Sequence, residues 1–312
     1  MKCEKCGQDN VAQAEFCTWC GTKLDPVIDS NVIPSRDLGQ LISHTFHLYG
    51  KNFWQFILIG LPPQILGFIT LLAVPELVPD LTAEFGSDAS REAAFEELTA
   101  AAPSALLVGL LTFFATVIAQ GATIHAVARQ YLGQAVEVMP SLQKGLSKSL
   151  ILIIAAIIAV IGLMAASLLI VILVGIPLII FLIISWAFIF PLIVIEGAGP
   201  VSALAGSYSL VKGNRWRVLG IGIVFILINF GIQVSITIVA GIIGGISDPL
   251  GTVFSTIGTV LLAPVMFIGL TVVYFDLRSA KYGLTLDSLA VDLDPSATRA
   301  TGTPPDDDLR RL

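Results

Sequence analysis

Residues 150–195 are the feature that most constrains the fold, because this stretch of 46 residues contains no Asp, Glu, Lys or Arg. An unbroken helix of that length would be about 70 Å long, whereas the hydrocarbon core of a bilayer is about 30 Å thick and needs about 20 residues to cross. Gly175 and Pro177 stand near the middle and favour a break there. We therefore expect a helical hairpin that crosses a membrane twice, over residues 150–174 and 176–195.

The composition supports this interpretation. Of the 312 residues, 55% are hydrophobic and 13% are charged, and the mean hydropathy is +0.87. Soluble domains carry about 25% charged residues. The deficit predicts an all-α integral membrane protein and argues against a soluble globular enzyme.

Four further apolar stretches have the length of a membrane span. Pro62 and Pro63 interrupt the first of them and Pro264 the last, so a kink is expected in each helix. With the hairpin, the predicted spans number six and cover residues 53–74, 104–127, 150–174, 176–195, 218–243 and 253–275.

The basic residues between these spans predict the orientation of the chain. Sixteen of the seventeen Lys and Arg residues fall in the N-terminal segment, the two loops after spans two and four, and the C-terminal segment, and Arg91 alone lies on the other side. Because basic residues are retained on the cytoplasmic side, we expect the cell (cytoplasmic) membrane as location, with both termini in the cytoplasm. The acidic loop at 75–103 would lie outside.

An amphipathic segment precedes the first, third and fifth spans, at residues 35–49, 140–149 and 200–211. Together these segments predict three units, each an interfacial helix followed by a transmembrane hairpin. Ser35 is the expected N-cap of the first helix, and Pro140 and Pro200 suit the first position of the other two. On the first helix, His44 and His47 are three residues apart and could share a metal, although solvated interfacial histidines are the commoner case.

Residues 1–24 contain all four cysteines of the chain, as two Cys-x-x-Cys-Gly motifs separated by ten residues. Two such turns present four thiolates to one ion, which predicts a small ribbon with a closed, structural Zn²⁺ site. Disulfides would need an oxidising compartment, and a redox motif would not need a matched second copy. The segment has no basic face for nucleic acid, so a protein partner or self-association is the better hypothesis. The predicted ligands are Cys3, Cys6, Cys17 and Cys20.

Polar side chains inside predicted spans are candidate functional groups, because their burial in lipid is costly. This set comprises Gln120, His125, Asn229 and Gln233. Interhelical hydrogen bonding is the preferred interpretation of it. A second set lies at the cytoplasmic boundary, where an interfacial charge cluster is expected to fix helix ends or contact lipid headgroups: Glu196, Arg215, Arg217, Asp276 and Arg278.

Two motifs resemble a known family. They are Gly-Ser-Tyr-Ser-Leu-Val-Lys-Gly-Asn-Arg-Trp-Arg at 206–217 and Tyr-Phe-Asp-Leu-Arg at 274–278. Residues 35–289 resemble a prokaryotic family of six-span membrane proteins of uncharacterised activity, related to the membrane region attached to some glycerophosphoryl diester phosphodiesterases. In those enzymes the chemistry belongs to a separate soluble domain, so the resemblance implies fold and location, not catalysis.

The predicted organisation is a zinc ribbon at 1–24, a linker at 25–34, the transmembrane domain at 35–289 and a disordered cytoplasmic tail at 290–312. No catalytic constellation is present in the sequence. A non-enzymatic scaffold or adaptor, with the ribbon binding a partner, is the first hypothesis for function. A transporter or lipid-handling protein for a hydrophobic or lipid substrate is the alternative.

Overall fold

The structure is a computed structural model that describes residues 33–73, 88–172, 174–245 and 247–293, with a few isolated positions among the first 22. The regular elements within these ranges are helices, which confirms the predicted all-α class. The predicted zinc ribbon, the linker up to residue 32 and the tail from residue 294 lie outside the described ranges.

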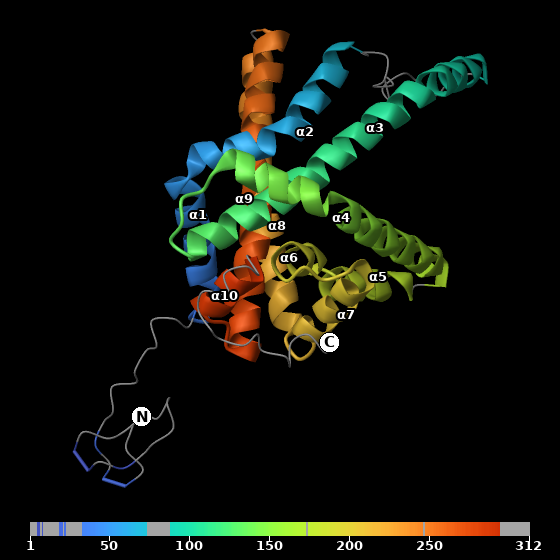
Figure 1. Ribbon diagram of the computed structural model, residues 1–312. Coiled ribbons are helices and arrows are strands. Elements are labelled where there is room, and N and C mark those ends of the chain that lie inside the picture. Colours follow the sequence, from blue (N-terminus) through green and yellow to red (C-terminus); the bar gives the residue numbers. More distant parts are fainter. Residues whose placement is uncertain are drawn as a thin grey trace.

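The chain forms ten α-helices over the described ranges, with a short 3₁₀ turn between the fourth and the fifth (Figure 1). Their bounds are α1 Leu38–Lys51, α2 Phe53–Ala73, α3 Asp88–Tyr131, α4 Val138–Ser167, η2 Leu168–Ile172, α5 Gly175–Ser185, α6 Ile189–Ile195, α7 Pro200–Val211, α8 Arg215–Gly244, α9 Asp248–Tyr282 and α10 Leu286–Leu293.

Five helical stretches are long and apolar enough to cross a membrane. A sixth is added if α1 and α2 count as one span, although these two helices meet at an angle of 88°. The structure therefore agrees with a multi-pass protein. The five stretches are Ala102–Tyr131, Val138–Ile170, Gly175–Ile195, Arg215–Gly244 and Leu250–Tyr282.

The helices converge at one end and diverge at the other. α2, α3 and α4 point away from one another beyond the common centre (Figure 1). The buried core lies where the second half of α3, the short α6 and the second half of α9 meet. The diverging arms expose large apolar side chains, such as Leu110, Ile161 and Ile242. Exposed apolar surface of this extent marks an interaction site or a membrane face in a natural protein.

Several predicted boundaries differ from the structure. α4 is one continuous helix, so the predicted interfacial helix at 140–149 is joined to the following span, whereas α1 and α7 are separate helices. The N-cap of α1 is Asp37 and not Ser35, because the carboxylate accepts from the Gln40 amide at 2.8 Å and the Gln40 side chain accepts from the Asp37 amide at 3.2 Å. α7 begins at Pro200 as expected.

The second arm of the central hairpin is divided into α5 and α6, where a single helix over 176–195 was expected. Ser207 of α7 explains the break. Its hydroxyl donates to the Ser185 carbonyl at 2.8 Å and accepts from the Phe188 amide at 3.1 Å, so it satisfies backbone groups that a continuous helix would pair internally. Pro191 adds to the effect, since it lacks the amide that would bond one turn back.

Close backbone approach joins α3 to α4. A Cβ atom placed on Gly145 would lie 2.3 Å from the Ile118 carbonyl oxygen and 2.9 Å from the Ala122 nitrogen. Both neighbours are backbone atoms, which cannot move aside as a flexible side chain can. Gly145 therefore sets the distance between the two helices at their crossing.

We expect Gly145→Ala to lower the apparent melting temperature in detergent, because the added methyl group forces the crossing apart at a cost of about 1–3 kcal/mol. Gly222→Ala is the matched control, since nothing lies within 4 Å of its added Cβ and alanine favours a helix. The control should melt at or above the wild-type temperature. Equal stability of both variants would show that the α3–α4 crossing is not tight.

Candidate functional site

Asp276 stands at the centre of a buried polar site at the end where the helices converge. Its side chain is fully buried on α9, a position that a carboxylate occupies only with partners. The Arg217 guanidinium of α8 lies 2.7 Å from Asp276 Oδ2, and the backbone amide of Arg36 donates to Oδ1. The carboxylate thus connects α9 both to α8 and to the segment before α1.

The segment at 33–36 is held by further hydrogen bonds. Arg217 donates to the Arg36 carbonyl at 2.7 Å, and the Ser279 hydroxyl donates to the Ile33 carbonyl. The Ile33 amide in turn donates to the Leu284 carbonyl at 3.1 Å. The chain that leads out of the cysteine-bearing segment is therefore fixed to α8, α9 and the turn after α9. We call these contacts of residues 33–36 the N-terminal clamp.

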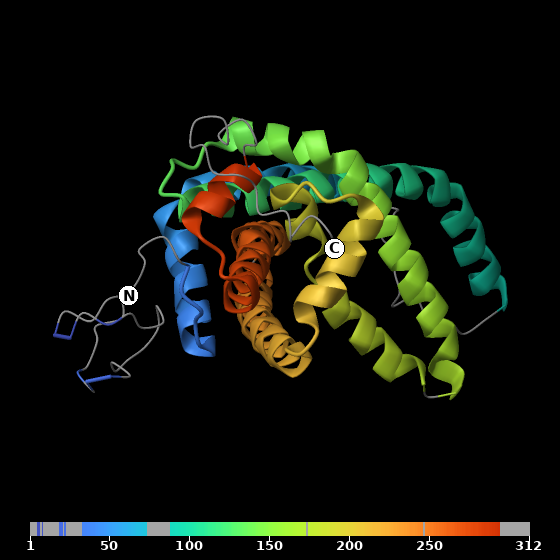
Figure 2. The same cartoon turned by 60° about the horizontal axis from the view of Figure 1, so that its bottom comes forward.

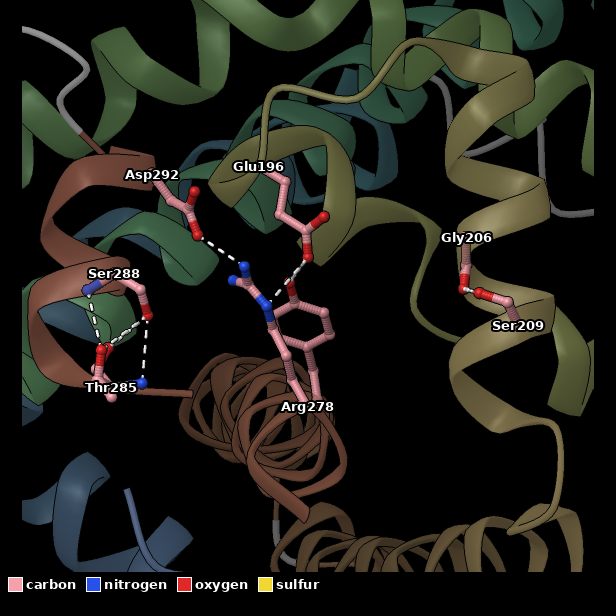
Figure 3. A network of polar contacts seen from close by, with 8 residues as sticks. Glu196, Gly206, Ser209, Arg278, Thr285, Ser288 and Asp292 are labelled. Carbon is pink, nitrogen blue, oxygen red and sulfur yellow. Dashed lines mark hydrogen bonds and ion pairs between the residues drawn. The ribbon is translucent and has the colours of Figure 1, made fainter. Parts of the chain in front are cut away.

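Arg278 forms the second half of the site. Its side chain is only 4% exposed and lies between two carboxylates (Figure 3). The NH2 nitrogen is 2.7 Å from Oδ2 of Asp292 in α10, and Nε is 3.4 Å from Oε1 of Glu196 after α6. The Tyr274 hydroxyl donates to the same Glu196 oxygen. Two carboxylates thus share one buried guanidinium, which ties α6, α9 and α10 together.

The charge balance around Arg278 affects Glu196. Burial raises the pKa of Glu196 above its ordinary value of 4.5, and the nearby Asp292 carboxylate acts in the same direction. Arg278 and the hydrogen bond from Tyr274 oppose the shift. Because Arg278 is shared between two carboxylates, its charge does not compensate fully for the burial of Glu196.

Arg215 takes no part in the two ion-pair groups, although it was predicted to belong to the same charge cluster. Its guanidinium carbon lies 4.8 Å from the centre of the Phe181 ring and 4.9 Å from that of Tyr208. Residues two apart on a helix point in different directions, so Arg217 reaches Asp276 and Arg215 reaches the aromatic rings. The other four residues of the predicted charge cluster lie in the site.

Arg36 and Asp292 belong to the site but were not among its predicted residues. Asp292 lies where the disordered tail was expected to have begun, but α10 continues to Leu293, with Leu289 and Leu293 buried. The apolar residues at 286, 289 and 293 have helical spacing, and this signal could have located α10. The contact of Arg36 uses its backbone amide, which no side-chain pattern reveals.

The four predicted intramembrane polar residues lie on two helices with different main packing partners. Gln120 and His125 lie on α3, which packs mainly against α4 and α2, whereas Asn229 and Gln233 lie on α8, which packs mainly against α9. His125 Nδ1 is 3.3 Å from the Ser141 hydroxyl of α4. This contact is the interhelical hydrogen bond expected of a packing residue.

The predicted zinc ligands can be placed only in part. Cys3 and Cys17 lie outside the described residues, and Cys6 and Cys20 each lie exposed at a turn. Cys20 Sγ is 3.2 Å from the Thr22 hydroxyl. Within the described part of the chain, no three His, Cys, Asp or Glu side chains are grouped as metal ligands would be. Four thiolates in paired Cys-x-x-Cys turns have the donor chemistry that Zn²⁺ prefers, and the zinc site stays a prediction.

No protein-family model, curated protein or solved structure matches this chain. The resemblance to the six-span family therefore stays a prediction as well.

We expect Asp276→Asn to reduce the free energy of unfolding by about 3 kcal/mol, the lower end of the range for a broken buried ion pair, because a third of the Arg217 side chain remains exposed. Glu137→Gln is the control. It breaks the Arg129–Glu137 pair, in which Glu137 is 56% exposed, and such pairs contribute at most about 1 kcal/mol. SDS titration of both variants in mixed micelles measures the difference, and equal losses would contradict the central role of Asp276.

The raised pKa of Glu196 gives a prediction for pH. A carboxyl group with a raised pKa contributes stability that is fully present below its ordinary value of 4.5 and is lost as pH rises through the raised value. Glu196→Gln cannot ionise, so its melting temperature relative to wild type should increase between pH 4.5 and pH 8. A relative loss for Glu196→Gln over this range would mean that the ionised form is favoured.

Proposed function

We propose that this chain is a multi-pass protein of the cell membrane that crosses the bilayer six times, keeps both termini in the cytoplasm and works as a non-enzymatic adaptor. In this proposal the cysteine-bearing segment binds structural Zn²⁺ and recruits a protein partner, or a second copy of the chain, at the membrane surface. The six-helix body anchors it.

Contacts between segments support an even number of crossings. The segment at 33–36, before α1, contacts residues 276, 279 and 284, which lie near the C-terminal end of the described chain. Segments in direct contact outside the bilayer belong on the same side. Five crossings would place these two segments on opposite sides of the membrane. Six crossings, with α1 and α2 together contributing one, place them on the same side. The basic loops at 129–149 and 196–217 contact the same region through Tyr131, Lys144 and Arg217, which agrees with their expected retention in the cytoplasm.

The N-terminal clamp is the observation that carries the adaptor proposal. A tether that only linked an independent ribbon to a membrane would need no fixed attachment. Here four hydrogen bonds hold Ile33 and Arg36, at the end of the predicted linker and just after it, and the Ile33 side chain is buried. This arrangement gives the ribbon a defined starting point beside the membrane body.

The transport alternative has less support. A polar route would require Gln120, His125, Asn229 and Gln233 to line one path, but α3 packs mainly against α4 and α2, and α8 mainly against α9. A hydrophobic or lipid substrate would not need such a route.

Metal analysis and crosslinking test the proposal. The purified protein should contain one zinc ion per chain, and Cys17→Ser/Cys20→Ser should lose it while it inserts into membranes normally. Crosslinking mass spectrometry in native membranes should then show that the variant loses specific partners of the intact chain. A control that changes two surface residues of the body, such as Lys212→Gln with Glu137→Gln, should keep both zinc and partners.

An unchanged partner set in a zinc-free variant would contradict the adaptor role. Absence of zinc from the wild-type protein would contradict the metal site.

A further inference from the structure

A second polar feature lies beside the N-terminal clamp. It is a cavity of about 290 Å³ between α1, the end of α3, the segment at 33–36 and the start of α10. It adjoins a wider hollow along α1 that shares Arg36, His44 and His47. We call the smaller space the α1 cavity. Its polar wall consists of Arg36, His44, His47, Lys51, Gln130 and Tyr131.

The charge of this wall is positive. Arg36 and Lys51 contribute two cations, and among the residues that the structure describes no carboxylate lines the cavity or the hollow. The Arg36 guanidinium lies 5.7 Å from the centre of the Tyr131 ring and its NH1 is 3.4 Å from the Tyr131 hydroxyl, which holds it against this wall. Such a wall favours an anion.

The Gln130 side chain indicates that a ligand must also carry a hydrogen-bond donor. Its side chain is 8% exposed, and its amide nitrogen donates to the Leu48 carbonyl at 3.2 Å. A carbonyl only accepts, so this bond fixes the orientation of the amide. The amide oxygen of Gln130 is buried and has no hydrogen-bond partner in the described part of the chain. A buried oxygen of this kind is costly unless it accepts a hydrogen bond, so a matching ligand brings an O–H or N–H donor.

His44 provides a second buried atom without a partner, its Nε2. Burial, then the charges of Arg36 and His47, lower the pKa of His44 to about 4, so the ring is neutral at pH 7. The ring packs edge-on against Tyr131, with centroids 5.4 Å apart. A neutral imidazole can either donate to a phosphate oxygen or accept from a hydroxyl.

The position of α1 favours a lipid as the source of the ligand. α1 meets α2 at 88°, so α1 lies along the membrane surface if α2 crosses it. Leu38 and Phe46 are exposed on α1, and Trp54 is 71% exposed just beyond it. Exposed aromatic residues beside basic ones are typical of the headgroup level of a bilayer.

We propose that the α1 cavity binds the headgroup of an anionic phospholipid that carries hydroxyl groups, with Arg36 and Lys51 facing the phosphate and the Gln130 amide oxygen accepting from a headgroup hydroxyl. This site depends on the membrane location proposed above but not on the zinc ribbon. It assigns the body a ligand class of its own.

Lipid binding to the full chain in mixed micelles tests this assignment, by native mass spectrometry and by thermal shift. Phosphatidylglycerol is the probe with both charge and hydroxyls, phosphatidylmethanol has the same charge without hydroxyls, and phosphatidylcholine has neither net charge nor hydroxyls. The wild-type protein should bind phosphatidylglycerol most tightly and phosphatidylcholine least tightly.

Three variants separate the contributions. Lys51→Gln should weaken binding of both anionic lipids about fivefold, the effect of one basic residue at a membrane surface. Lys212→Gln makes the same charge change outside the cavity and should leave binding unchanged. Gln130→Leu should remove the preference for phosphatidylglycerol over phosphatidylmethanol while anionic lipids still bind better than phosphatidylcholine.

Several results would overturn the proposal. Equal binding of phosphatidylglycerol and phosphatidylcholine, or equal effects of Lys51→Gln and Lys212→Gln, would exclude a headgroup site in the cavity. Equal wild-type binding of the two anionic lipids would exclude the hydroxyl contact. Displacement of the lipid by millimolar inorganic phosphate or glycerol phosphate would assign the cavity to a soluble phosphate instead. If Gln130→Leu does not fold, two experiments still test the proposal. One is the comparison of Lys51→Gln with Lys212→Gln, and the other is the binding of the three lipids to the wild-type protein.

Discussion

The burial of Asp276 is the constraint on which the converging end of this structure depends. A carboxylate at the end of a largely apolar helix is stable only when charged and hydrogen-bonding partners surround it. Arg217 and the Arg36 amide supply them from two other segments. Arg278 lies two residues further along α9 and so points to a different side, where it meets Glu196 and Asp292. One helix end thereby joins α6, α8, α10 and the N-terminal clamp.

The apolar arms are held together by different contacts. In lipid, helices gain little from burying apolar surface against each other, so close contact requires small residues. Gly145 meets the α3 backbone, and Gly251 of α9 would place a Cβ 2.8 Å from the Gly244 Cα of α8. Away from such contacts the arms separate, as the turned view shows (Figure 2). Their large apolar side chains are exposed there. Polar contacts therefore fix the converging end, and glycines fix the helix pairs.

Hydropathy and proline positions predicted most helices, because these signals are local. The start of α7 at Pro200 follows from them, and α9, at Asp248–Tyr282, contains the predicted span 253–275. The break before α6 could not be predicted in this way, since it depends on Ser207 from another helix. Four members of the charge cluster could be predicted from their place at span ends. Arg36 could not, because its backbone makes the contact. The Arg215 side chain, predicted to belong to the cluster, packs against aromatic rings instead.

Membrane topology is the measurement that tests this account most directly. Epitope tags at the N-terminus, at the C-terminus and within residues 75–103 can be probed with antibody on intact and on permeabilised cells. Six crossings with a cytoplasmic clamp predict that only the 75–103 tag is detected on intact cells and that both terminal tags need permeabilisation. Detection of one terminus on intact cells would mean an odd number of crossings. It would contradict the contact between residues 33–36 and α9 on which the proposed function depends.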